Sequence, residues 1–190
     1  MGCNSAQARG SEVAIVLYFL LDNILFAKKL VNKFSTLILS IIAFLGAIFP
    51  YYYVWLYKNN INIDLAFSTK RFFSGRQRIW EPIINTLSEN YRNLLLGVGS
   101  NGVTSAGTIV NAHNWFLGTI FYFGIIIFVL YFLLLILLVK SFNNANVVLF
   151  FVAIFINGFV ETGAMYILTQ MFTFLAVGIA STFTQKNRLY

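Results

Sequence analysis

The sequence contains few of the residues that build metal and redox sites. Its 190 residues include one cysteine, Cys3, and one histidine, His113. A single cysteine excludes a disulfide within the chain and a cysteine-ligated metal cluster, and a single histidine excludes a multi-histidine metal site. We therefore expect no metal ion and no cofactor.

Charge is also scarce. Only 10% of the residues are charged, while 59% are hydrophobic and 18% are aromatic. Because soluble domains carry about 25% charged residues, the composition predicts an all-α integral membrane protein, with residues 1–190 forming a single membrane domain. The net charge of +7 is compatible with nucleic-acid binding, but the basic residues flank apolar runs. We attribute them to orientation in the bilayer and expect no nucleic-acid partner.

A transmembrane helix needs about 20 mostly apolar residues, and the sequence offers about five such segments. They cover residues 11–27, 34–57, 114–139, 146–160 and 164–183. Pro50 lies inside the second segment and is expected to kink it, because proline lacks the N–H of a helix-interior residue.

The basic residues of the short connections and the tail set the expected orientation. They are Lys28, Lys29, Lys33, Lys140, Lys186 and Arg188. Five spans place all of them on one side, which the positive-inside rule makes cytoplasmic. The long loop 58–112 and the turn that carries Glu161 are then external. An external N-terminus without a preceding helix is hard to insert, so we expect the chain to be the C-terminal part of a longer protein.

Apolar residues recur in the long loop at steps of three and four, which predicts one amphipathic helix in the membrane interface. The positions are Trp80, Ile83, Ile84, Leu87, Tyr91, Leu94 and Leu95. Ser74 and Gln77 can form a capping box before this helix. Its regular part is expected to begin near Glu81, and Gly97 and Gly99 are expected to end it.

Residues 97–102 read GVGSNG, which fits the glycine pattern of dinucleotide-binding loops. That pattern requires a strand before it and a helix after it within a βαβ unit. Here it follows the predicted amphipathic helix. We therefore interpret it as a turn near the active site.

Arg9, Arg76 and His113 fall at the external ends of predicted spans. Two guanidinium groups can hold a diphosphate through forked hydrogen bonds, and a neutral imidazole can take a proton from a sugar hydroxyl. This combination suits transfer of a group from a lipid diphosphate to an alcohol. The alternative is that the arginines contact lipid headgroups and that His113 caps a helix.

Acidic and aromatic residues near the membrane allow two interpretations each. Glu12 and Glu161 can pair with external arginines or contribute to function. Asp22 lies near the cytoplasmic end, and we interpret it as structural. Trp80 and Trp115 are either interface anchors or platforms on which a sugar stacks.

Four motifs together resemble the C-terminal half of bacterial O-antigen polymerases and O-antigen ligases. They are QARGS (7–11), SGRQRIW (74–80), LLLGVGSNG (94–102) and AHNWFLGTIFYFGI (112–125). The family shows an arginine that opens a helix on the outer face, an arginine four residues before a tryptophan, a G-x-G turn, and a His-Asn pair that opens a membrane helix.

The resemblance implies a metal-independent membrane glycosyltransferase at the outer face of the bacterial cytoplasmic membrane. Its donor is a glycan linked to undecaprenyl diphosphate, its acceptor is a second glycan, and other polysaccharide-assembly proteins are candidate partners. We expect polymerisation of O-antigen or capsule repeat units. The alternatives are an O-antigen ligase, or a non-enzymatic multi-pass protein or inactive fragment.

The expected site combines the motifs of the resemblance with the external polar residues. The candidate catalytic residues are His113 and Arg76. The candidate substrate-binding residues are Arg9, Arg78, Trp80, Asn114 and Glu161.

Overall fold

The computed structural model describes residues 14–59, 75–99, 102–104, 107 and 111–159. Its helices cover residues 14–22, α2 (Leu25–Lys33), α3 (Ser35–Lys58), α4 (Gln77–Glu89), α5 (Tyr91–Leu96), α6 (Trp115–Ser141) and α7 (Ala145–Asn157). Within these ranges the chain is mostly helical and forms no strand, which confirms the predicted all-α class for the described residues.

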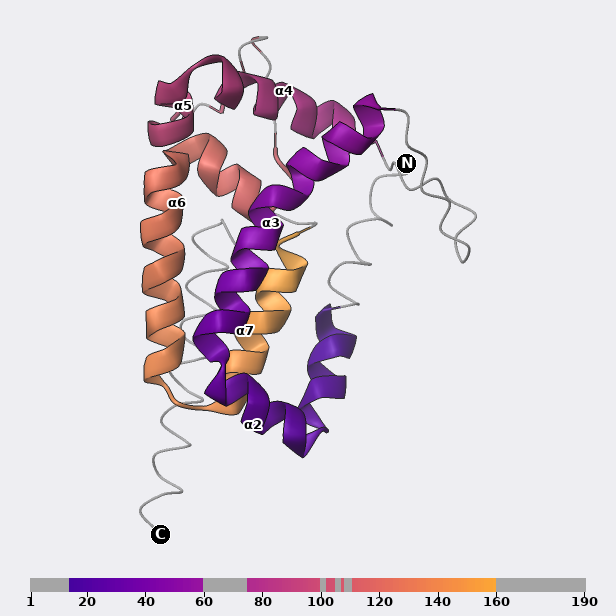
Figure 1. Ribbon diagram of the computed structural model, residues 1–190, viewed down its shortest axis with the longest axis vertical. Helices are drawn as coiled ribbons and strands as arrows, with labels where there is room; N and C mark the ends of the chain where they lie inside the picture. Colours follow the sequence, from indigo (N-terminus) through magenta and orange to yellow (C-terminus); the bar gives the residue numbers. More distant parts are fainter. Residues whose placement is uncertain (1–13, 60–74, 100–101, 105–106, 108–110, 160–190) are drawn as a thin grey trace.

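The helices form a bundle that is covered at both ends. In Figure 1, α3, α7 and the long part of α6 run along one another, α2 lies at one end, and α4 and α5 lie at the other. Contacts of α3 with α6, α7 and α4 place α3 at the centre of this arrangement. The lysines of α2 and the polar helices α4 and α5 are therefore at opposite ends of the bundle.

Two of the described helices, α3 and α6, are long and apolar enough to cross a membrane by length and composition. Both expose large apolar side chains, such as Phe44 of α3, which is 63% exposed, and Leu134 of α6, which is 66% exposed. Exposed apolar surface of this extent favours contact with lipid over contact with water. The structure thus supports the membrane character that the composition predicted.

The helix α6 turns back on itself at Gly124. That residue has φ 80° and ψ 169°, which is not helical. A straight helix would separate Trp115 and Phe132 by about 25 Å, yet their ring centroids are 5.0 Å apart. The first part of α6 therefore folds over the second, and both face Phe155 of α7, whose ring lies 5.5 Å from Phe132.

The prediction of one continuous helix over residues 114–139 is wrong, because the helix is broken at Gly124. The uninterrupted part of α6 after Gly124 ends at Ser141, a length of about 25 Å at 1.5 Å per residue. The nine residues before the break form a separate short segment, visible in Figure 1 as an inclined piece at the start of α6.

The other predicted apolar segments agree with the structure to different degrees. The segment 34–57 is α3, with Pro50 inside the helix, and the segment 146–160 corresponds to α7. The predicted segment 11–27 is interrupted, because the helix over residues 14–22 ends at a turn before α2. The segment 164–183 lies outside the described residues.

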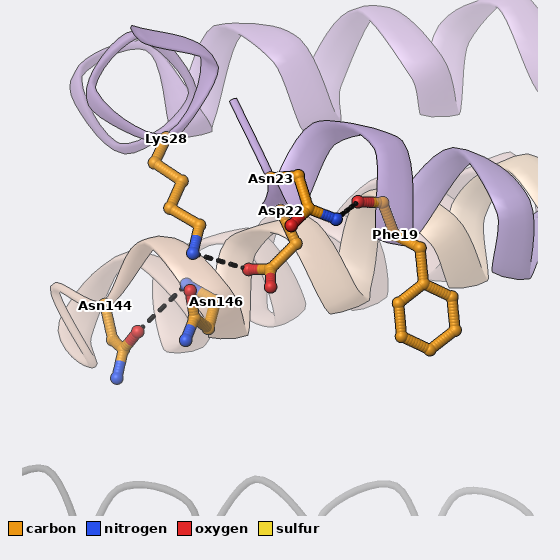
Figure 2. A network of polar contacts seen from close by, with 6 residues as sticks. All are labelled: Phe19, Asp22, Asn23, Lys28, Asn144 and Asn146. Atoms are coloured by element: carbon orange, nitrogen blue, oxygen red, sulfur yellow. Dashed lines mark hydrogen bonds and ion pairs between the residues drawn. The ribbon is translucent and has the colours of Figure 1, made fainter. Parts of the chain in front are cut away.

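Local polar contacts stabilise the turn before α2 and the start of α7 (Figure 2). Across the turn before α2, Lys28 Nζ lies 2.7 Å from Asp22 Oδ1. Asn23 Nδ2 donates a hydrogen bond of 2.7 Å back to the preceding helix, and Asn144 Oδ1 accepts one of 2.9 Å from a backbone N–H at the start of α7. These contacts favour the structural interpretation of Asp22.

Candidate functional site

The candidate site begins with α4, which presents one apolar face to the bundle. Trp80, Ile83 and Leu87 are at most 1% exposed, which confirms the predicted apolar periodicity within this helix. Tyr91 and Leu95, which the prediction placed on the same stripe, are 78% and 40% exposed. The helix begins at Gln77 rather than near Glu81. It ends at Glu89, and after Asn90 the helix α5 starts at Tyr91, so the predicted single helix is two helices.

Trp80 is the central residue of this end of the protein. Its side chain is fully buried, and its indole N–H donates a hydrogen bond to the carbonyl of Ala112. Its ring packs edge-on against Tyr53 and Phe49 of α3, at 5.0 and 5.9 Å between centroids. Trp80 thus joins α4 to α3 and to the residue that precedes His113.

Arg76 and Arg78 differ in environment although they are two residues apart. Arg76 occupies the N-cap position of α4 and is half-buried. Its guanidinium carbon lies 5.9 Å from the centroid of the Trp80 ring, within the range of a cation–π contact. Arg78 is exposed. This difference agrees with the geometry of a helix, where such neighbours do not share a face.

Gln77 is a residue whose role the sequence did not predict. Its side chain is 8% exposed, and its Oε1 is buried without a hydrogen-bond partner. The N-cap residue of α4 is Arg76, which makes no side-chain capping bond, so Gln77 does not occupy the N3 position of the predicted capping box. A buried acceptor without a partner is costly, and Gln77 directly follows Arg76 in the sequence.

His113 lies in a constrained turn before α6. Its φ of 45° is in the left-handed region, which histidine enters more readily than most residues. Its backbone N–H donates to Asn111 Oδ1 at 3.2 Å, and its side chain is half-buried. Trp80 holds the residue before it. A left-handed conformation that the surroundings maintain is a feature of functional sites.

Asn114 is fully buried and links α6 to α3 and to the turn after α7. Its Oδ1 accepts from the Leu117 N–H at 2.7 Å and caps α6. Its Nδ2 donates to the carbonyls of Gly46 and Phe159, at 3.3 and 3.0 Å. Gly46 is near the middle of α3, so the chain before α6 reaches into the bundle, whereas the sequence predicted that α6 begins at the external end of a span.

We expect Asn114→Ala to destabilise the fold by about 2–4 kcal/mol. The substitution removes a helix cap, which is worth about 0.5–2 kcal/mol. It also deprives two carbonyls, those of Gly46 and Phe159, of a donor, and a buried polar group left unpaired costs about 1–3 kcal/mol. Thermal unfolding of the purified protein in detergent measures the loss.

Asn90→Ala is the matched control. Asn90 caps α5 by accepting from the Arg92 N–H at 2.9 Å, but it is exposed and α5 is short. Its loss should cost less than about 1 kcal/mol. Equal unfolding temperatures for the two variants would contradict the linking role of Asn114.

The glycine turn after α5 is docked into the break of α6. The N–H groups of Val98 and Gly99 donate to the carbonyls of Phe121 and Tyr122, at 2.8 and 3.1 Å. These carbonyls would otherwise be left without a partner by the reversal at Gly124. The turn follows the helix α5 and not a strand, which agrees with its interpretation as a turn rather than a dinucleotide loop.

The structure connects some of the predicted site residues through Trp80. Arg76 contacts the Trp80 ring. The indole N–H of Trp80 donates to the carbonyl of Ala112, the residue before His113. Trp80 and Asn114 are themselves buried, with their polar groups bonded inside the protein. Arg9 and Glu161 lie outside the described residues.

The described part of the chain contains no group of three or more metal-ligating side chains. It connects two groups through Trp80: the guanidinium of Arg76 contacts the Trp80 ring, and the Trp80 indole N–H donates to the carbonyl of the residue before His113, which carries the imidazole. These groups can bind an anion and exchange protons and hydrogen bonds with hydroxyls. No protein-family model, no curated protein and no solved structure matches the chain.

Proposed function

We propose that the chain acts in a membrane glycosyltransferase that extends lipid-linked glycans during surface-polysaccharide assembly. The donor is a repeat unit on undecaprenyl diphosphate, and the acceptor is a hydroxyl of a second glycan. The observation that carries the proposal is the connection of Arg76 to the His113 turn through one buried residue, Trp80.

The position of the His113 turn supports a catalytic role for this residue. The turn is irregular backbone that reaches the level of the middle of α3, because Asn114 bonds the carbonyl of Gly46. Irregular backbone inside a membrane protein is tolerated where protein buries it or where it lines a water-filled cavity. A half-buried His113 in such a turn is suited to meet a polar substrate.

In the proposed reaction the acceptor oxygen attacks the anomeric carbon of the donor sugar. The new glycosidic C–O bond forms as the bond from that carbon to the phosphate oxygen breaks, and undecaprenyl diphosphate leaves. His113 takes the proton of the acceptor hydroxyl. Arg76, together with Arg9, stabilises the charge on the departing diphosphate.

The proposal includes a multi-pass arrangement of about five spans in the bacterial cytoplasmic membrane, with α4 and α5 on the external side. The separation of charged groups supports this orientation. Lys28, Lys29 and Lys33 lie on α2, at the end of the bundle opposite to α4 and α5 (Figure 1). The positive-inside rule assigns the α2 end to the cytoplasm.

A second candidate is a non-enzymatic membrane protein. It is favoured by the burial of Trp80 and Asn114, whose polar atoms bond within the protein. On this alternative, Arg76 and His113 maintain the fold and contact lipid headgroups. Substitutions at these two residues then change stability and not glycan synthesis.

The pair Arg76→Lys and Arg78→Lys tests the proposed transferase. Arg76→Lys, introduced at the native locus, should reduce glycan extension by about tenfold or more, because lysine cannot make a forked contact with a diphosphate. Arg78 is exposed on another side of α4, and Arg78→Lys should change extension by less than about threefold. Gel analysis of glycan length and abundance measures both.

The stability of the two variants completes this test. Lysine can also lie over an aromatic ring, so Arg76→Lys should accumulate in membranes like the unaltered protein. Equal losses of extension from both variants would contradict the assignment of Arg76 to the diphosphate. Unchanged extension in Arg76→Lys would favour the non-enzymatic candidate.

A further inference from the structure

A polar pocket lies away from Arg76, between the end of α4, α5 and residues 102–104. Its volume is about 420 Å³, within the range of small-molecule sites. It is lined by Thr86, Asn90, Arg92, Asn93, Gly97, Val98, Val103 and Thr104. The lining therefore combines hydroxyl, amide and guanidinium groups with only two apolar side chains.

The floor of the pocket is fixed by contacts within the protein. Thr86 and Thr104 are 2% and 4% exposed. Asn93 Nδ2 donates to the Thr86 carbonyl at 3.2 Å, and Val98 is held against the break of α6 by its bond of 2.8 Å to the Phe121 carbonyl. A pocket with a fixed polar floor loses little conformational freedom when a ligand binds.

Arg92 gives the pocket its charge. It is exposed at the rim, and no carboxylate within the described part of the chain pairs with it. The lining contains no acidic side chain, so it offers no carboxylate ligand to a divalent cation. A single cation among amides and hydroxyls suits a small anion that also carries hydroxyl groups.

We propose that this pocket binds an acidic sugar unit of the glycan, with its carboxylate on Arg92 and its hydroxyls on the side chains of Asn90 and Asn93. This inference rests on the proposed glycosyltransferase function. Thr86 is ten residues beyond Arg76 along the chain, and about 15 Å separates such positions on a helix. The pocket is thus a subsite for a sugar at a distance from the diphosphate.

Thiol labelling of the full chain tests the site directly. With Cys3, the single cysteine, replaced by serine, Val103→Cys places a thiol in the pocket wall, where Val103 is 39% exposed. Trigalacturonic acid at ten times its dissociation constant should slow maleimide labelling by about tenfold, by mass action. Asn85→Cys, on the exposed face of α4 outside the lining, should label at an unchanged rate.

Arg92→Gln should raise the trigalacturonic acid concentration needed for protection by about tenfold or more, because a charge-assisted contact is lost. Lys29→Gln, which removes an exposed cation at the α2 end, should leave the concentration needed for protection unchanged. Equal protection by maltotriose or by inorganic phosphate would overturn the acidic-sugar assignment. Absence of protection by trigalacturonic acid would overturn the site.

The labelling result is independent of glycan extension in cells. If Arg76→Lys leaves extension intact while trigalacturonic acid still protects Val103→Cys in an Arg92-dependent way, the sugar site stands and the transferase proposal fails. If extension depends on Arg76 but labelling is not slowed by the acid, the transferase proposal stands and the acidic-sugar pocket is overturned.

Discussion

Gly124→Ala is expected to destabilise the protein by about 3 kcal/mol or more, through strain and overlap together. Gly124 has φ 80° and ψ 169°, a region that only glycine enters without strain. A Cβ atom there would also overlap the carbonyl of Leu95. Because that obstacle is backbone, α5 would have to move away from the break in α6.

The substitution should also destabilise the contacts around Gly124, because the glycine turn after α5 is hydrogen-bonded at the same break. Val98 and Gly99 donate to the carbonyls of Phe121 and Tyr122, and displacement of α5 would weaken both bonds. The reversal also brings Trp115 against Phe132. We expect a lower unfolding temperature in detergent and a lower amount of protein in membranes.

Gly99→Ala separates backbone strain from overlap. Gly99 has φ 85°, but nothing lies within 4 Å of the position of its Cβ atom. Alanine there should cost about 1–2 kcal/mol from the left-handed backbone alone. Similar unfolding temperatures for the Gly124 and Gly99 variants would show that α5 is not pressed against the break.

The helices were predictable where a local pattern specifies them. The apolar run of α3 and the three- and four-residue steps of Trp80, Ile83 and Leu87 depend only on neighbouring residues. The reversal at Gly124 was not predictable from hydropathy, since the residues on both sides of it are apolar. The reversal requires hydrogen-bond donors for the carbonyls of Phe121 and Tyr122. The N–H groups of the distant residues 98 and 99 supply them.

The candidate site was predictable in the types of its residues more than in their arrangement. Arg76 and Arg78 were both candidate site residues, and the structure buries only Arg76 in part. The role of Trp80 as an anchor inside the protein depends on its bond to Ala112, 32 residues later. The links from Asn114 to α3 and to Phe159 are also long-range, and no local pattern signals them.

His113→Asn is expected to fold like the unaltered protein while glycan extension falls by about 10²–10⁴-fold, the usual contribution of a general base. Asparagine tolerates the left-handed region that His113 occupies with φ 45°, and its backbone N–H can keep the bond to Asn111. It cannot take up a proton. Extension of a lipid-linked glycan at the native locus, with membrane abundance measured in parallel, tests this expectation.

Two further variants distinguish the base from a positioning role. His113→Gln keeps hydrogen-bonding capacity without a titratable group, so near-normal extension in this variant would mean that His113 only orients the acceptor. His113→Ala adds the cost of alanine at φ 45°, about 1–2 kcal/mol, and should be less stable than His113→Asn. If stability and extension fall together in all three variants, the imidazole maintains the turn between Trp80 and Asn114, and the proton acceptor must be another group.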